Sequence, residues 1–461
     1  MKVVFIVIDT LRADHLGCYG YDLNTSPNID KIAREGVLFE RAYATDVPTQ
    51  PSYTSMFTGQ RGVKTGIVSH SPTEDLSPNV PYLSEILASH GYLTAAVSTL
   101  YVMRRWFARG FHYYMNPYAG KPRQLLQQVD ADDINAMAIP WIRQNADKDF
   151  FIFIHYWDPH GIYMPPPKEY RYLFYRGKDP TDPNNHSLDR LKKSVLWPFY
   201  KRHLDRIREA NNLVGEITDI EFVKAQYDGE IKYVDDKIGE LVQLLEELGI
   251  IDETLLIVTA DHGESLGEHE EYFDHATVYE PVIHVPLIIR YHELPKGKRV
   301  KDLVQLIDLP YTILKLAGIP IPKEFEGRDL VPIANGEANG YDEVYSNQGL
   351  WTAKRAVITK DGWKLIKTID PGFWECPPLE LYNLVKDPSE TKNLVYEEED
   401  IVNELELKMV RWLEKELGNR PDPLRLISAA GLPPKEWVKG AAEEYIKGGG
   451  TYEEVRMKMG F

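Results

Sequence analysis

Apolar residues along this chain gather in short runs that alternate with stretches of helical spacing. Five of these runs are typical of buried parallel strands: Val3–Ile8, Leu93–Ser98, Phe150–His155, Leu255–Ala260 and Val285–Tyr291. Strands that alternate with helices along a chain indicate a sheet with helices on its faces. The pattern therefore predicts an α/β fold with a doubly wound, mostly parallel sheet.

Helical spacing is clearest before the fourth run. Apolar side chains recur there every three or four residues until Gly249, at positions Ile220, Val223, Tyr227, Ile231, Val234, Ile238, Leu241, Leu245 and Leu248. A shorter helix is expected over Ser84–His90. By contrast, residues 116–148 and 164–215 are charged, irregular and contain prolines. We expect them to be insertions above the sheet that carry specificity elements.

The pattern changes in the last quarter of the chain. Ala353–Thr359 and Trp363–Lys367 predict a small hairpin, and an amphipathic helix is expected near Ile401–Leu417. We therefore predict a catalytic α/β domain over residues 1–335 and a smaller α+β subdomain with a helical tail over residues 336–461.

Composition limits the classes of partner. The 461 residues include 53 Lys and Arg against 70 Asp and Glu, which gives a net charge of −17. Such a surface repels a nucleic-acid backbone, so bulk nucleic-acid binding is disfavoured, although a local cationic pocket is not. The two cysteines exclude a disulfide framework, and no apolar run approaches the ~18 residues of a membrane span. We expect a cytoplasmic protein without membrane contact, and we leave open whether it forms a homo-oligomer.

Polar residues follow two of the predicted strands. Asp9 ends the first run, and Asp261 with His262 follows the fourth. Ligands of open α/β sheets bind outside these carboxyl ends, so Asp9 is a candidate metal ligand, with a helix N-cap as the open alternative. Asp261 and His262 offer oxygen and nitrogen donors for a metal, or form a hydrogen-bonded couple. The further histidines His269 and His275 close by favour the metal.

Two more segments carry candidate chemistry. Thr49 lies in a hydroxyl-rich turn framed by Pro48 and Pro51, before a short apolar helix. It is either a helix cap or a nucleophile whose hydroxyl pKa a metal lowers. Asp158 and His160 follow the third run in a Pro-Gly turn. A structural turn accounts for Asp158 but not for His160.

The order of these four segments resembles the sulfatase family of the alkaline phosphatase superfamily. The family's markers are an opening strand that ends in Asp, a Cys-x-Pro-Ser-Arg…Thr-Gly block, Asp-Pro-His, and Asp-His-Gly-Glu. In this chain they read Asp9, Thr49-Gln-Pro-Ser-Tyr53…Thr58-Gly59, Asp158-Pro-His160 and Asp261-His-Gly-Glu264. The resemblance runs from residue 3 to about residue 420. It implies an alkaline phosphatase-like fold, with a mixed, mostly parallel sheet flanked by helices.

Three departures from the family pattern concern its chemistry. Thr49 stands where sulfatases have the Cys or Ser that becomes formylglycine, and Tyr53 replaces the Arg of the block. Threonine cannot become formylglycine, whereas a direct Thr alkoxide resembles the nucleophile of the superfamily's phosphodiesterases and phosphotransferases. Thr10 replaces a second Asp, and losing this hard oxygen ligand favours Mn²⁺ or Zn²⁺ over Ca²⁺ or Mg²⁺.

The resemblance also implies roles for single positions. One divalent metal would be held by Asp9, Thr49, Asp261 and His262. The catalytic residues would be Thr49, His160 and His275. Substrate contacts would come from Thr99, His70, Tyr53 and Arg12, and a surface position is an equal alternative for Arg12.

The expected function is a metal-dependent hydrolase of a small phosphoester, acting through a covalent Thr49 intermediate. A single metal suits a diester better than a monoester, because the transferred group of a diester carries less negative charge. A sulfatase or phosphonate monoester hydrolase on the same fold is the first alternative. A non-catalytic binding protein is the second, and the retained metal ligands and pocket histidines argue against it.

Overall fold

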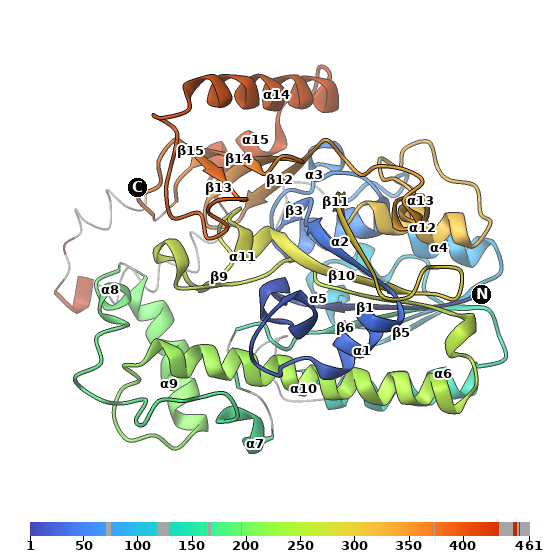
Figure 1. The fold of residues 1–461 in the computed structure, drawn as a ribbon, viewed down its shortest axis with the longest axis horizontal. Helices are drawn as coiled ribbons and strands as arrows, with labels where there is room; N and C mark the ends of the chain where they lie inside the picture. Colours follow the sequence, from blue (N-terminus) through green and yellow to red (C-terminus); the bar gives the residue numbers. More distant parts are fainter. Residues whose placement is uncertain are drawn as a thin grey trace.

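A mixed sheet forms the centre of the molecule (Figure 1). The computed structural model describes residues 1–70, 75–117, 129–161, 163–164, 167–194, 196–372, 374–432, 446–449 and 451. Within them an eight-stranded sheet has the order β11-β2-β10-β7-β1-β6-β4-β5. Its parallel centre consists of β4 (Leu93–Val97), β6 (Phe150–Tyr156), β1 (Lys2–Ile8) and β7 (Thr254–Thr259). These are the first four predicted strands, and their direction is confirmed.

The remaining strands of this sheet show where the apolar pattern fails. The fifth predicted run forms β10 (His284–Arg290), but it is antiparallel to both neighbours, which corrects the predicted parallel direction. The chain between β7 and β10 contains no long crossover helix, and without one a neighbouring strand returns antiparallel. Charged residues interrupt the apolar runs of β2 (Val37–Tyr43) and β11 (Lys298–Gln305), so these strands were not predicted, nor was the short β5 (Tyr113–Met115).

Helices cover both faces of the sheet. One face carries α10 (Ile220–Glu247), α6 (Ala131–Gln144) and α1 (Pro27–Glu35), as Figure 1 shows. The other face carries α2 (Thr49–Thr58), α4 (Leu83–Ser89) and α12 (Asp308–Leu316). The predicted doubly wound α/β class and the long amphipathic helix are therefore confirmed. Among the described residues, no helix is long and apolar enough to cross a bilayer.

The two predicted insertions are more regular than expected. The first contains α6, whose charged outer face and internal Pro140 obscured a stripe that buries Ile134, Ala138 and Trp141. The second contains three helices, α7 (Lys168–Arg171), α8 (Asp189–Lys192) and α9 (Trp197–Ala210). Part of the first insertion, residues 118–128, lies outside the described residues.

A second sheet has the order β15-β14-β13-β12-β3. The predicted hairpin is β13 (Ala353–Thr359) with β14 (Trp363–Asp370), the predicted helix is α14 (Glu399–Leu417), and both are confirmed. The other strands of this sheet are β12 (Glu343–Gly349), β15 (Leu379–Asn383) and β3 (Asp46–Val47). A further helix, α15 (Pro423–Ala430), follows α14 in the chain. Because β3 precedes α2 in the chain, this sheet contains a strand from the N-terminal part. The domain boundary at residue 335 stays a prediction.

Short elements complete the description. They are α3 (Gly62–Thr65), α5 (Leu100–Met103), β8 (Ser265–Leu266), β9 (Tyr272–Asp274), α11 (Glu280–Ile283) and α13 (Leu330–Asn335). The loops between β7 and β10, which include β8 and β9, lie beyond the carboxyl end of β7. This edge of the sheet is where the chemically interesting side chains meet.

Candidate active site

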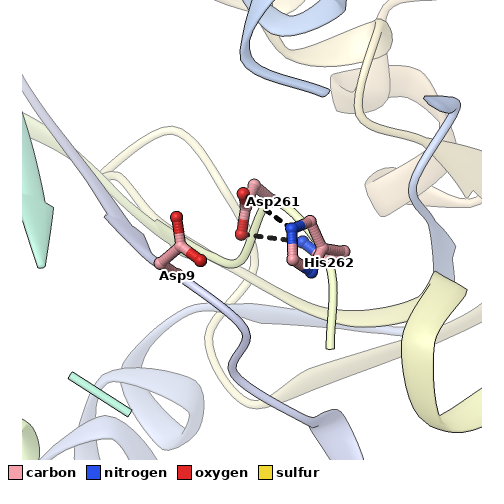
Figure 2. Close-up of side chains that lie close together, drawn as sticks. All are labelled: Asp9, Asp261 and His262. Atoms are coloured by element: carbon pink, nitrogen blue, oxygen red, sulfur yellow. Dashed lines mark hydrogen bonds and ion pairs between the residues drawn. The ribbon is translucent and has the colours of Figure 1, made fainter. Parts of the chain in front are cut away.

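Three ligand-type side chains meet at the carboxyl ends of β1 and β7 (Figure 2). The two strands are parallel neighbours with Val7 beside Thr259, so the residues that follow them emerge side by side. One ligand atom from each of Asp9, Asp261 and His262 lies within 4.8 Å of the others, and all three residues are buried. The structure thus brings together the three strand-end ligands that the sequence predicted.

Several buried acceptor atoms of this cluster lack a hydrogen-bond donor, as expected for the ligands of a cation. His262 Nδ1 lies 2.9 Å from the carbonyl oxygen of Gly263, so Nδ1 carries the proton and Nε2 presents a lone pair. That lone pair lies 3.3 Å from Asp261 Oδ2. Neither carboxylate oxygen of Asp9, nor Asp261 Oδ2, has a hydrogen-bond partner among the described residues. Buried acceptors that face one another are costly unless a cation lies between them, so these residues fit one divalent metal.

Thr49 lies beside this cluster as the first residue of α2. Its Oγ1 is 3.3 Å from His262 Nε2, and the residue is 1% exposed. The first turn of α2 is hydrogen-bonded to the cluster, because Ser52 Oγ donates to the backbone oxygen of Asp261 at 2.7 Å. The backbone N–H of Thr10 donates to Asp261 Oδ1 at 3.2 Å. The hydroxyl is therefore held at the edge of the three metal candidates.

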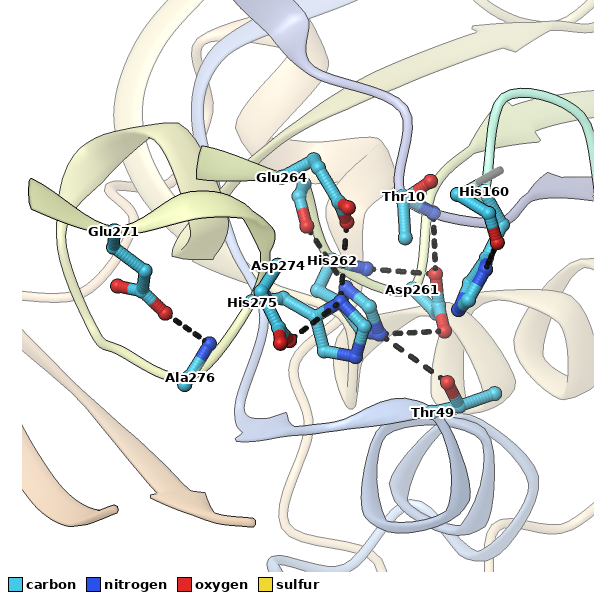
Figure 3. Close-up of polar contacts among 12 residues, drawn as sticks. Thr10, Thr49, His160, Asp261, His262, Glu264, Glu271, Asp274, His275 and Ala276 are labelled. Carbon is cyan, nitrogen blue, oxygen red and sulfur yellow. Dashed lines mark hydrogen bonds and ion pairs between the residues drawn. The ribbon is translucent and has the colours of Figure 1, made fainter. Parts of the chain in front are cut away.

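His160 and His275 lie beside the cluster (Figure 3), and because His160 is only half-buried we call them the open-side histidines. The His275 ring centroid is 4.3 Å from that of His262 and 5.6 Å from that of His160. His275 Nδ1 lies 3.1 Å from Glu264 Oε2, and Tyr163 donates its hydroxyl to Glu264 Oε1 at 2.9 Å. His160 Nδ1 lies 2.8 Å from the carbonyl oxygen of Gly161. In both rings Nδ1 is engaged, which leaves Nε2 for a substrate.

Burial sets the charges in this site. It lowers the pKa of His160 to about 4, and it lowers the pKa values of His262 and His275 as well. Burial raises the pKa of Glu264 to about 7. Burial and the charge of Asp261 raise the pKa of Asp9. At neutral pH the histidines therefore supply no fixed positive charge for an anionic substrate.

Two predicted substrate residues lie close to these histidines. His70 is buried, and burial followed by the charges of His275 and His160 lowers its pKa to about 3. Thr99 is fully buried, and its Oγ1 accepts a 2.6 Å hydrogen bond from Trp157 Nε1. The Trp157 ring in turn lies 5.3 Å from that of His160. Contact of either residue with substrate stays a prediction.

The other two predicted substrate residues, Arg12 and Tyr53, make contacts within the protein. The Arg12 guanidinium is buried and pairs with Asp14 and Glu268, each at 2.7 Å, so it is neither a surface group nor free for a substrate. Tyr53 is fully buried, with its ring 5.1 Å from that of His155. We therefore leave Arg12 and Tyr53 out of the proposed substrate contacts. Arg12 stabilises the loop after β7 instead.

Two buried neighbours of the cluster, His155 and Glu264, had no role in the prediction from sequence motifs. His155 is the residue before the last of β6, and its Nε2 lies 3.4 Å from Asp9 Oδ2. Glu264 belongs to the Asp-His-Gly-Glu motif, but its contact with His275 depends on the fold of the intervening loop. His269, which favoured a metal because it lies near in sequence, instead stacks on Tyr279 at 3.6 Å between centroids.

Known proteins are similar to this chain over most of its length. The sequence profile of the sulfatase family matches residues 2–319, and that of "N-sulphoglucosamine sulphohydrolase, C-terminal" matches residues 267–416. N-acetylglucosamine-6-O-sulfatase of Bacteroides thetaiotaomicron is 25% identical over 85% of this chain and 82% of its own. Arylsulfatase of Clostridium perfringens is 25% identical over 86% and 91%. Iduronate 2-sulfatase of Homo sapiens is 26% identical over 70% of each chain.

Solved structures show the same fold. One, a protein in complex with its substrate D-glucosamine-2-N,6-O-disulfate, superposes with a TM-score of 0.73 at 22% identity, over 92% of this chain and 99% of that one. The phosphonate monoester hydrolase of Silicibacter pomeroyi superposes with a TM-score of 0.68 at 23% identity, over 91% and 96%. These likenesses confirm the predicted alkaline phosphatase-like class of mixed sheet.

Proposed function

Because the chain belongs to the sulfatase family of hydrolases, we propose that it hydrolyses a sulfate monoester with Thr49 as the attacking group. The observation that carries the proposal is the place of Thr49 Oγ1, 3.3 Å from His262 Nε2 at the edge of the buried Asp9, Asp261 and His262 cluster. The relatives named above are sulfatases, which supports a sulfate ester ahead of the phosphodiester that Thr49 alone suggests.

Four side chains would hold the metal: Asp9, Asp261, His262 and Thr49. When it is bound, the ion supplies positive charge next to the Thr49 oxygen and a nonbridging ester oxygen. One imidazole among the ligands, and Thr10 in place of a second Asp, favour Mn²⁺ or Zn²⁺ over Ca²⁺ or Mg²⁺. The residues thus fit a single-metal site.

Thr49 and the two open-side histidines then divide the reaction. Thr49 Oγ1 attacks the sulfur in line with the bond to the leaving oxygen, and that bond breaks as the Oγ1–S bond forms. As Oγ1 attacks, the unprotonated Nε2 of one imidazole, that of His160 or His275, takes the proton of the Thr49 hydroxyl and then passes it to the leaving oxygen. Glu264 holds His275 in place by its contact with Nδ1. Water then cleaves the covalent ester on Thr49 and restores the hydroxyl.

Thr49 itself favours a second candidate function. Threonine cannot be converted to formylglycine, so the sulfate must leave by direct attack of water on the sulfur. A phosphonate monoester or a phosphodiester presents a transferred group with the same single negative charge. The same geometry can therefore act on these esters, and the similar fold of a phosphonate monoester hydrolase is compatible with this candidate.

A substrate panel distinguishes these functions. The metal-loaded enzyme is assayed with an aryl sulfate, an aryl phosphonate monoester, a bis-aryl phosphate and an aryl phosphate that share one leaving group. We expect the highest kcat/KM on the aryl sulfate, with measurable turnover of the other singly charged esters and least on the doubly charged aryl phosphate. Turnover of the bis-aryl phosphate alone would replace the sulfatase proposal by the phosphodiesterase expected from the sequence.

A further inference from the structure

The segment that follows Thr99 is hydrogen-bonded to α2, the helix that begins with Thr49. Arg104 Nε donates to Gln50 Oε1 at 3.3 Å, and Trp106 Nε1 donates to Thr54 Oγ1 at 3.2 Å. Gln50 and Thr54 both belong to α2, and Gln50 is the residue next to Thr49. Two side-chain hydrogen bonds therefore fix the position of Arg104 relative to the candidate nucleophile.

The Arg104 guanidinium is anchored through Nε but not neutralised. No carboxylate pairs with it among the residues that the structure describes, whereas Arg109 pairs with Glu85 at 2.6 Å. Its terminal nitrogens Nη1 and Nη2 have no hydrogen-bond partner in the same part of the chain. A guanidinium held in this way presents a planar pair of N–H donors that matches a carboxylate or a sulfate.

Arg104 is more exposed than the helix start to which it is bonded. It is half-buried, whereas Thr49 and Gln50 are 1% and 5% exposed. Its charge reaches His70, where it adds to burial, His275 and His160 in lowering the pKa of that imidazole. The guanidinium is therefore close enough to His70 to act on its charge, and it is bonded to the residue next to Thr49.

We propose that Arg104 binds a second anionic group of the substrate, a carboxylate or sulfate on its alcohol part, and thereby selects esters with two negative charges. The inference rests on the proposed hydrolysis of a sulfate ester at Thr49. A net charge of −17 repels such substrates at long range, so an unpaired local cation is needed to hold them.

The test compares two aryl sulfates, 4-nitrophenyl sulfate and its analogue with a carboxylate next to the ester oxygen. For Arg104→Gln, the ratio of kcat/KM on the carboxylated ester to that on the plain ester should fall about tenfold, the scale of one charge-assisted hydrogen-bonded pair. Arg104→Lys should keep part of the preference. Arg105→Gln, which changes an exposed neighbouring arginine, is the matched control and should keep the full ratio.

Equal losses on both esters would show that Arg104 acts on the transferred group, and unchanged kinetics would show that it binds nothing. Either result overturns the inference. Binding is measured separately by calorimetry in Thr49→Ala, where the ester is not turned over. There, adding Arg104→Gln should raise the Kd of the carboxylated ester about tenfold more than that of the plain ester. Absence of hydrolysis by the wild-type enzyme would reject the proposed function, and this binding comparison would still decide the role of Arg104.

Discussion

Single side-chain contacts decide which atoms of the site face a substrate. Gly263 accepts from His262 Nδ1, Gly161 accepts from His160 Nδ1, and Glu264 contacts His275 Nδ1. Each contact orients the Nε2 of its ring. Sequence motifs predicted these histidines but not their partners, because the partners come from loop geometry. The contact of His155 with Asp9 was missed for the same reason, since His155 reads as the last residue of a buried strand.

The metal assignment is tested by removing one ligand. Asp261→Ala should lose the bound metal, because Asp261 supplies an otherwise unpartnered carboxylate oxygen to the cluster. Metal content is measured by elemental analysis after dialysis against a trace of Mn²⁺ or Zn²⁺. Asp361→Ala, which changes an exposed aspartate in the β13–β14 turn, is the control and should keep full stoichiometry. Full stoichiometry in Asp261→Ala would refute the site.

The two open-side histidines are tested against a third histidine outside the site. His160→Ala and His275→Ala should each lower kcat by roughly tenfold to a thousandfold, the range for losing one group that acts on the transition state. His269→Ala should keep activity, because that ring stacks on Tyr279 away from the cluster. Thermal unfolding of all three variants provides the check on folding. Lowered stability with unchanged kcat would make the first two histidines structural.

At the scale of elements, the predictions were right where apolar runs are unbroken. The four central strands each bury every residue or nearly so, and such runs are visible without a structure. The direction of a strand was harder to predict. The strand β10 runs antiparallel to β7, because the connection between them has no crossover helix, and the sequence pattern does not show that. The strands β2 and β11 were not predicted at all, because charged residues interrupt their apolar runs.

Element packing around Thr49 depends on one buried carboxylate. Asp46, the first residue of β3, accepts from Ser55 Oγ of α2, from the backbone N–H of Gly62 at α3, and from Asn347 Nδ2 of β12, at 2.9, 2.8 and 3.1 Å. Asp46→Ala would leave these donors unsatisfied and should cost about 3 kcal/mol of unfolding free energy, measured by urea denaturation. Asp342→Ala at the exposed Lys360 pair should leave the midpoint unchanged. Equal stability of the two variants would contradict this account of the packing.

At the scale of the whole molecule, the two sheets are tied together near the site. Buried Lys364 of β14 pairs with Glu280 at 2.9 Å and with Glu390 at 2.8 Å. Glu280 begins α11, which follows the loop that carries His275. The resemblance predicted a large part and a smaller C-terminal part, but these buried pairs join residues far apart in the chain. Neither periodicity nor composition contains that information.

The metal candidates lie at one edge of the sheet, while a continuous apolar core fills both faces. Treatment with a chelator should therefore abolish turnover and leave the far-ultraviolet circular dichroism spectrum unchanged. The unfolding free energy should fall only by the binding contribution of the ion, about 3–4 kcal/mol at metal concentrations 100 to 1,000 times the Kd. Readdition of Mn²⁺ or Zn²⁺ should restore activity. Collapse of the spectrum on chelation would instead make the metal a structural element.

The central claim is that Thr49 Oγ1 forms a covalent ester during turnover. The most direct measurement is a rapid acid quench of the metal-loaded enzyme with an aryl sulfate, followed by peptide mass spectrometry. We predict one sulfo group on Thr49 in the wild-type enzyme, and neither adduct nor turnover in Thr49→Ala, whose metal content stays intact through Asp9, Asp261 and His262. Undiminished turnover by Thr49→Ala, with no adduct in the wild type, would contradict the claim and make water the attacking group.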